Sequence, residues 1–201
     1  PQSLAVYEGQ LIAGCAGSSS PAWGGFPGSI ARWNGARWSG LGSGTGFLVF
    51  ALAVPDGFLF AGGYETVGLH PQNRVARWDG ATWQVLPSIP GPFTGSYVRA
   101  MAVHQGKLVA GGVGMLASNV QEWTGTGWLP VGTFPGWAET IAFASHRGEL
   151  VAGGWAVSPS TTPSIARWDG AAWSPMGSGV DNFVTALNVH EGLLWVGGGF
   201  A

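Results

Sequence analysis

Short apolar runs alternate with glycine-centred turns along the whole chain, and they recur in a fixed order. An apolar run, a turn and a second apolar run appear at LAVYEGQLIAGC, LAVPDGFLFAGG, MAVHQGKLVAGG, FASHRGELVAGG and LNVHEGLLWVGG. Their turn glycines are Gly9, Gly57, Gly106, Gly148 and Gly192. Because glycine takes positive φ without steric cost, this pattern predicts two β-strands joined by a tight turn in each copy.

A second motif follows each of the first four copies and contains two tryptophans. It reads ARWNGARW, ARWDGATW, QEWTGTGW and ARWDGAAW. An Asp-Gly or Asn-Gly pair between apolar runs is a strong hairpin signal, so two further strands are predicted in each unit. The tryptophans recur every 45 residues, at Trp33, Trp78, Trp123 and Trp168 and at Trp38, Trp83, Trp128 and Trp173. We expect all eight to be structural, packing against each other or against the next unit.

Four antiparallel strands in 45 residues is the size of one propeller blade. The sequence therefore predicts an all-β protein, a β-propeller of four-stranded antiparallel blades with four full repeats plus half of a fifth. It would be five-bladed or a fragment of a larger propeller. A single domain, residues 1–201, would contain repeats at approximately 4–51, 52–100, 101–142 and 143–186, and a partial repeat at 187–201.

The composition agrees with a structure that buries both faces of its strands. Hydrophobic residues make up 46% of the chain and charged residues only 9%, whereas ordinary soluble domains are about a quarter charged. The longest apolar stretch, Phe47 to Val54, is far shorter than the roughly 20 residues of a membrane-spanning helix. Stacked blades explain this composition better than insertion into a membrane does.

The charged residues exclude one class of partner. The formal net charge is −2 and the 8 basic residues are scattered singly, so there is no Lys/Arg cluster to neutralise nucleic-acid phosphates. The single cysteine, Cys15, excludes an internal disulfide framework, and it stands where other copies have the second glycine of the GG pair.

Candidate chemistry is sparse. His104, His146 and His190 share one position in successive repeats, and imidazole is a common zinc ligand. Polar residues also suit exposed turns, and residues on neighbouring blades are too far apart to share one ion, so we expect no metal site. Asp79 and Asp169 belong to the C–D turns, and Glu8, Asp56, Glu149 and Glu191 lie in or beside the A–B turns. No acidic pair recurs near a histidine or a loop serine as a base and nucleophile would. We therefore expect no cofactor and no enzymatic activity.

The repeat resembles known families. A hydrophobic strand, a glycine turn, LVAGG, a spacer, an aromatic-Asp pair and a later tryptophan form the skeleton of kelch repeats. The pattern ARWDG..W..LGSG followed by ALAV..G.LVAGG is most similar to the fungal cortical polarity-marker family and to secreted bacterial surface propellers. This resemblance implies an extracellular or cell-surface interaction module. The third repeat departs from the pattern at Glu122 and Thr124, where other copies have Arg and Asp or Asn.

The connections between strands differ most between repeats, and loops of a rigid scaffold commonly carry binding residues. We expect B–C loops that include Tyr64–Asn73 and Trp155–Ser164, and D–A loops that include Pro87–Tyr97 and Thr133–Glu139. Both sets emerge on one face of a propeller. The candidate aromatic ligand-binding surface on this face comprises Trp23, Tyr64, Phe93, Trp137 and Trp155. Such a surface suits a glycan or an extended protein segment, although each ring could instead anchor its own loop.

The fifth unit has strands A and B but no C–D motif. Its B strand should have an open edge, and open edges invite pairing with another chain. The missing strands could come from more of the same chain, the propeller could be naturally open, or a second chain could complete it. An alternative function is therefore a structural subunit of an oligomer or filament assembled through this edge.

Overall fold

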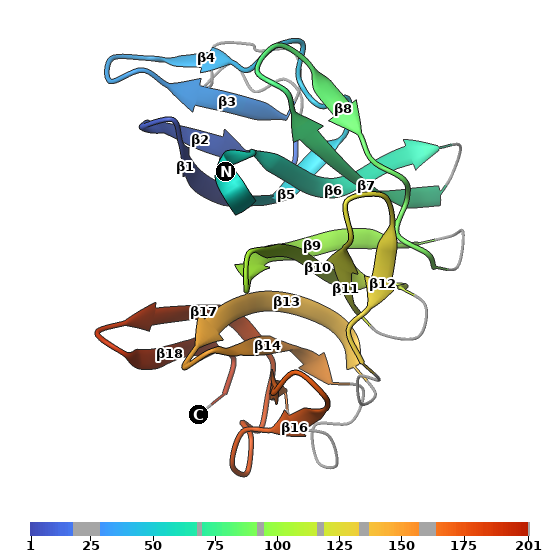
Figure 1. The fold of residues 1–201 in the computed structure, drawn as a ribbon, viewed down its shortest axis with the longest axis vertical. Coiled ribbons are helices and arrows are strands. Elements are labelled where there is room, and N and C mark those ends of the chain that lie inside the picture. The colour runs from blue at the N-terminus through green and yellow to red at the C-terminus, as the bar shows by residue number, and fades with distance from the viewer. Residues whose placement is uncertain are drawn as a thin grey trace.

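The computed structural model describes residues 1–17, 29–67, 70–91, 95–115, 119–132, 137–156 and 164–200. Over these residues the chain is all-β apart from a 3-10 turn at Pro55–Gly57, and its four-stranded antiparallel sheets form the predicted β-propeller blades (Figure 1). Each blade runs A-B-C-D in sequence order. The strands are β1 (Ser3–Tyr7), β2 (Gln10–Gly14), β3 (Ile30–Trp33) and β4 (Trp38–Gly40) in blade 1; β5 (Leu48–Ala53), β6 (Phe60–Val67), β7 (His70–Trp78) and β8 (Trp83–Val85) in blade 2; β9 (Tyr97–His104), β10 (Lys107–Val113), β11 (Val120–Trp123) and β12 (Trp128–Pro130) in blade 3; β13 (Trp137–His146), β14 (Glu149–Ala156), β15 (Ile165–Trp168) and β16 (Trp173–Pro175) in blade 4; and β17 (Val184–His190) and β18 (Leu193–Gly198) in the fifth, two-stranded sheet.

The A strands are the inner strands of the propeller, since each lies beside the A strand of the next blade in the series β1, β5, β9, β13 and β17. Antiparallel pairing brings the B–C and D–A connections to one end of every blade, which we call the loop face (Figure 1). The repeat limits expected from the sequence fall inside β5, β9, β13 and β17. Each blade begins a few residues earlier, because the repeated glycine marks the end of the inner strand and its start carries no repeated residue.

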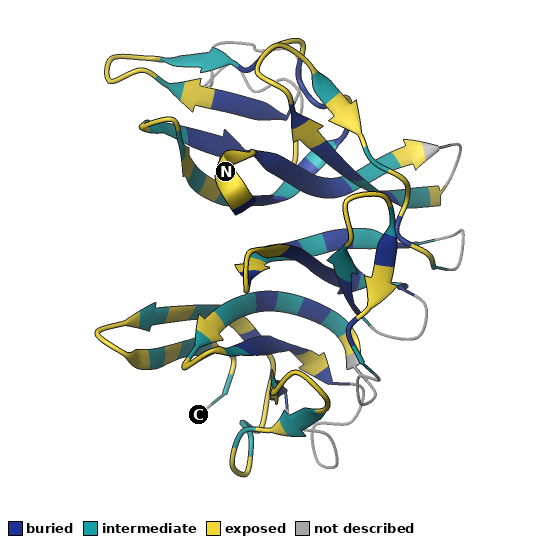
Figure 2. Cartoon of the chain, viewed as in Figure 1, coloured by how far each residue is buried: buried dark blue, intermediate teal, exposed yellow. Residues whose placement is uncertain are grey.

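The core is a series of interfaces between successive blades. Leu59, which precedes β6, and Ala61 within it pack towards blade 1. Phe60, between them, packs towards blade 3. Blade 3 repeats this arrangement at Leu108, Val109 and Ala110. Successive residues of a strand point to opposite faces, so a strand buried on both faces must be apolar at consecutive positions. The dark-blue strands of the middle blades in Figure 2 follow this rule.

The glycine pair of each B strand allows two close approaches. The first glycine faces the next blade: a Cβ on Gly111 would lie 2.7 Å from Phe143. The second faces its own inner strand, where a Cβ on Gly112 would overlap the Tyr97 carbonyl oxygen and one on Gly154 the Glu139 carbonyl oxygen. The close backbone approach expected from the pair is therefore present, and it coincides with a β-bulge in the inner strand.

The two tryptophans of each outer hairpin are in contact, with ring centroids 5.2–5.6 Å apart. The indole N–H of the second tryptophan also joins its blade to the preceding one. Trp83 donates to the Leu41 carbonyl (3.1 Å), Trp128 to the Pro87 carbonyl (2.9 Å) and Trp173 to the Val131 carbonyl (2.6 Å). An indole N–H that leaves water needs such an acceptor. Because each acceptor here belongs to the preceding blade or to the segment that follows it, these bonds connect successive blades.

The departures in the third repeat are compensated locally. Thr124 takes the turn position of Asp79 and Asp169, and its hydroxyl accepts a hydrogen bond from the Gly127 amide as their carboxylates accept from turn amides. Glu122 replaces an arginine, but it pairs with Lys107 at 2.7 Å. Blade 4 has the same ion pair with the charges exchanged, Arg167 with Glu149.

The predicted B–C loop Tyr64–Asn73 is wrong. Residues 64–67 and 70–73 instead continue β6 and β7 as a paired hairpin, in which Tyr64 lies opposite Asn73. Arg74 holds this extension by donating to the Glu65 carboxylate at 2.9 Å. Likewise Trp155, Tyr97 and Glu139 lie in strands β14, β9 and β13 rather than in loops. Period and turn residues locate strand centres, but here cross-strand partners extend the strands.

Candidate functional site

Four inner strands contain a β-bulge at the same level, near the loop face. The ladder skips one residue between Val49 and Ala51, and the equivalent extra residues in the next blades are Arg99, Ile141 and Thr185. A bulge redirects the side chain of its extra residue and is common beside functional sites. Phe50, the extra residue of β5, is turned towards Tyr64, Tyr97 and Arg99, with which it makes ring and cation–π contacts.

Three aromatic rings form one cluster at this level. Phe50 stacks on Tyr64 with centroids 5.6 Å apart and the planes 20° from parallel. Tyr97 tilts against both rings, at 6.3 Å from Phe50 and 6.0 Å from Tyr64. Offset stacked and tilted pairs at these separations are the favoured aromatic geometries. The rings therefore hold one another in fixed orientations.

An ion pair borders the cluster. The guanidinium of Arg99 lies over the Phe50 ring, 5.2 Å from its centroid, and Arg99 Nε is 3.6 Å from Glu139 Oε1. The Tyr97 hydroxyl donates to the same carboxylate oxygen at 3.4 Å. Burial and the nearby Glu139 carboxylate raise the pKa of Tyr97, so its hydroxyl remains a hydrogen-bond donor at neutral pH.

These side chains line a cavity of about 380 Å³, completed by Pro71. The volume lies in the range of small-molecule sites, and the lining joins apolar rings to a few polar groups that could orient a ligand. Side chains from three blades contribute: Phe50 and Tyr64 from blade 2, Tyr97 and Arg99 from blade 3, and Glu139 from blade 4. The site exists only when the blades are assembled.

A buried amide holds the chain that leads into Tyr97. Asn73 on β7 accepts from the Ile89 amide at 2.8 Å, donates to the Ile89 carbonyl at 3.0 Å and donates to Ser96 Oγ at 3.0 Å. These bonds fasten the connection between β8 and β9 to the preceding blade. A buried amide with its hydrogen bonds satisfied is rigid, so blade 2 fixes the position of the segment that leads into Tyr97.

The structure brings one of the five predicted binding aromatics into this cavity. Tyr64 lines it. Trp155 occupies the equivalent position on blade 4, immediately after the glycine pair, but this residue is 56% exposed and does not line the cavity. Trp137 begins β13, and its side chain is not described. Trp23 and Phe93 lie outside the described residues.

Sequence reasoning missed Phe50, Tyr97, Arg99 and Glu139. Tyr97 and Glu139 occupy the same position in successive blades, just before the bulge, and Phe50 and Arg99 are themselves bulge residues. A signal was available in the sequence. When the copies are aligned on the glycine pair, these positions vary in residue type, whereas the residue after each bulge position is always alanine: Ala51, Ala100, Ala142 and Ala186. The bulge itself leaves no residue type by which it could be recognised.

The three aligned histidines do not converge. His104 is buried and its Nδ1 is 3.4 Å from Ser145 Oγ, His146 Nε2 is 3.1 Å from the Gly192 carbonyl oxygen, and His190 is exposed beside Glu191. Each of the first two therefore contacts the following blade. Burial lowers the pKa of His104, and the Glu122 charge opposes this only in part. Among the described residues, no group of three or more His, Cys, Asp or Glu side chains could hold a metal ion.

Within the described part of the chain, no helix is long and apolar enough to cross a membrane.

Comparison with known proteins supports the fold. No protein-family model matches the chain, and no curated protein matches it. A solved structure titled "Structure of YjhT" matches with a TM-score of 0.58 and 14% sequence identity, over 87% of this chain and 64% of that one. The chain thus spans about 64% of the length of this neighbour. At this identity the likeness concerns the fold alone, and together with the four-stranded sheets it identifies the chain as a β-propeller.

Proposed function

We propose that the protein is a non-catalytic, kelch-like binding module whose ligand is a neutral carbohydrate, held in the cavity between Phe50, Tyr64, Tyr97, Arg99 and Glu139. The observation that carries this proposal is the cluster of three rings beside an ion pair in one cavity. A sugar ring has C–H groups on its faces and hydroxyls on its rim. The C–H groups suit aromatic faces, which carry partial negative charge, and the hydroxyls suit a site with both donors and acceptors.

The charge of the cavity favours a neutral ligand. Arg99 is the cationic side chain in its lining, and its partner Glu139 is the anionic one. An acidic ligand would have to approach Glu139, whose repulsion opposes the attraction of Arg99. Hydroxyl groups meet no such opposition, because they can accept from Arg99 and donate to Glu139 at once.

The same contacts argue for binding rather than catalysis. The Glu139 carboxylate already accepts from the Tyr97 hydroxyl and lies beside the Arg99 guanidinium. These contacts orient its oxygens as acceptors for a ligand hydroxyl. An extracellular or cell-surface location belongs to this proposal through the resemblance of the repeats.

The test is binding to a microarray of neutral and acidic glycans, followed by calorimetric titration of the best neutral ligand. Arg99→Ala should weaken binding at least about tenfold, since buried arginine and aromatic contacts dominate binding energies. Ile141→Ala is the matched control, because Ile141 is the bulge residue of the next blade and does not line the cavity. Retention of full affinity by Arg99→Ala, or preference for acidic glycans alone, would show that the proposal is wrong.

A second candidate function is self-association through β18. This strand belongs to a two-stranded sheet, and on one of its faces Leu193 and Trp195 are 58% and 59% exposed. Exposed apolar strands invite pairing with another chain. Light scattering over a range of concentrations should show association that Trp195→Ser abolishes and Leu129→Ser, equally exposed on β12, does not. A monomer at all concentrations would exclude this function.

A further inference from the structure

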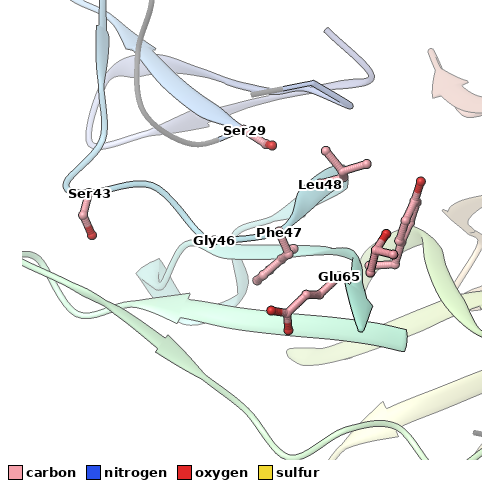
Figure 3. A pocket seen from close by; sticks show the side chains of 8 residues that line it. Ser29, Ser43, Gly46, Phe47, Leu48 and Glu65 are labelled. Carbon is pink, nitrogen blue, oxygen red and sulfur yellow. The ribbon is translucent and has the colours of Figure 1, made fainter. Parts of the chain in front are cut away.

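A second cavity adjoins the first, and Tyr64 belongs to the lining of both. The second cavity has a volume of about 390 Å³ and lies between the β4–β5 connection and the C-terminal end of β6, as Figure 3 shows with Ser43, Gly46 and Glu65. The two volumes are nearly equal. Tyr64 therefore lines two cavities of similar size near the loop face.

The second cavity has the same kind of lining as the first. Phe47, Leu48 and Tyr64 supply apolar surface, and Ser43 and Thr66 supply hydroxyls. The β4–β5 connection, which supplies Phe47 to the lining, is held by a hydrogen bond from the Thr45 hydroxyl to the Phe47 carbonyl at 2.8 Å. Apolar surface with a few oriented polar groups again suits a sugar ring.

Each cavity also has one carboxylate held by one arginine. Arg74 Nε donates to Glu65 Oε2 at 2.9 Å, and Arg74 is itself braced by Gln72 Oε1 (3.3 Å) and Ser88 Oγ (3.2 Å). In the first cavity Arg99 pairs with Glu139 over a longer distance, 3.6 Å between Nε and Oε1, and Arg99 itself lines that cavity, whereas Arg74 holds Glu65 from outside the lining of the second. Both carboxylates are thus oriented, charge-balanced acceptors. Repetition of one chemistry on both sides of a shared ring indicates a ligand that repeats one chemical unit.

We infer that the ligand is a neutral oligosaccharide of at least two sugar units, one in each cavity, with the linkage between them passing Tyr64. This inference rests on the proposed carbohydrate-binding function and adds the length of the ligand. A single sugar uses the cavity of Phe50, Tyr97 and Arg99, and the second unit adds contacts with Ser43, Glu65 and Thr66. Because the second unit binds without a second loss of translational freedom, affinity rises steeply with its addition.

The experiment titrates the protein with β-1,4-linked glucose, α-1,4-linked glucose and β-1,4-linked N-acetylglucosamine oligomers of one to four units. In the series that binds, affinity should rise at least about tenfold from one unit to two. Glu65→Gln should remove most of this gain and leave binding of the single sugar unchanged. Glu149→Gln is the matched control, because Glu149 forms an equivalent pair with Arg167 away from both cavities.

The possible failures are distinguishable. If a series binds with the same affinity at all lengths, or if Glu65→Gln weakens one and two units equally, the two-unit inference is overturned and the proposed function stands. If none of the three series binds, both are overturned. Binding of an extended peptide library in place of the sugars, with loss in Glu65→Gln, would also overturn both and assign the surface to a protein ligand. Thermal melts of each variant verify that the blades remain folded.

Discussion

In their outer hairpins, blades 1–4 repeat the same tryptophan pair and the same kind of turn, whereas the bulged inner strands β5, β9, β13 and β17 each carry a different residue near the loop face. The hairpins repeat the tryptophan pair and the turn whose side chain binds backbone amides. The bulge position, by contrast, is Phe50, Arg99, Ile141 or Thr185. Two regions of the same blades thus follow opposite rules.

The difference separates what assembles the propeller from what could recognise a ligand. An outer hairpin contacts the preceding blade in the same way each time, so its residues must repeat. The bulge carries a redirected side chain on an unchanged backbone, so its residue can vary without loss of the fold. The glycine pair connects the two regions, because it makes room for both the next blade and the bulge.

The largest effect is expected from filling the space that the second glycine of a pair leaves beside the bulged inner strand. Gly154→Ala places a Cβ on the Glu139 carbonyl oxygen, where backbone must move, and should destabilise the protein by about 3 kcal/mol or more. Gly127→Ala is the control, since a Cβ there meets nothing within 4 Å. Urea unfolding measures both. Equal stability of the two variants would contradict the role given to the glycine pair.

A smaller loss is expected from the outer hairpin. Trp128→Phe keeps an aromatic ring but removes the indole N–H that donates to the Pro87 carbonyl, which should cost about 2 kcal/mol. Trp155→Phe should change the free energy of unfolding by less than about 0.5 kcal/mol because Trp155 is mostly exposed. The comparison of the two by chemical denaturation shows whether the indole bond, rather than tryptophan content, connects the blades.

One substitution should stabilise the protein by making a repeat more regular. Thr140 is fully buried, and its hydroxyl has no hydrogen-bond partner among the described residues. Val49, Val98 and Val184 hold the equivalent position in the other bulged strands. Thr140→Val removes an unsatisfied hydroxyl at nearly constant shape and should raise the free energy of unfolding by about 1 kcal/mol. A loss of stability would reveal a hydrogen bond to that hydroxyl.

The smallest effect concerns the exchanged charges of blade 3. Glu122→Arg places a like charge beside Lys107 and should cost about 0.5 kcal/mol, and adding Lys107→Glu should restore stability by recreating the arrangement of blade 4. The effect should shrink as salt is raised, because both side chains are partly exposed. A double-mutant cycle at two salt concentrations measures the coupling. Purely additive effects would mean that the pair contributes nothing.

The sequence by itself determined the blades. Strand order, the tight turns and the tryptophan hairpins follow from short-range signals repeated at a constant interval, and consecutive apolar residues already required burial of both strand faces. Backbone preferences and the burial of strand faces depend on residues close together in the sequence, so both can be predicted from the sequence. The prediction of a loop at Tyr64–Asn73 was wrong because cross-strand pairing, which depends on partners such as Arg74 and Glu65, extended the hairpin.

Only the tertiary structure decided the candidate site. Phe50, Tyr97 and Glu139 are separated by more than forty residues from one to the next, and each comes from a different blade. They meet because successive inner strands lie side by side and because the bulge in β5 turns Phe50 towards Tyr97 and Arg99 on the next inner strand. Neither the packing of blades nor the direction of a bulged side chain can be predicted from the type of a single residue. The repeat therefore predicted the scaffold, and the assembled blades selected which of its varying positions come together.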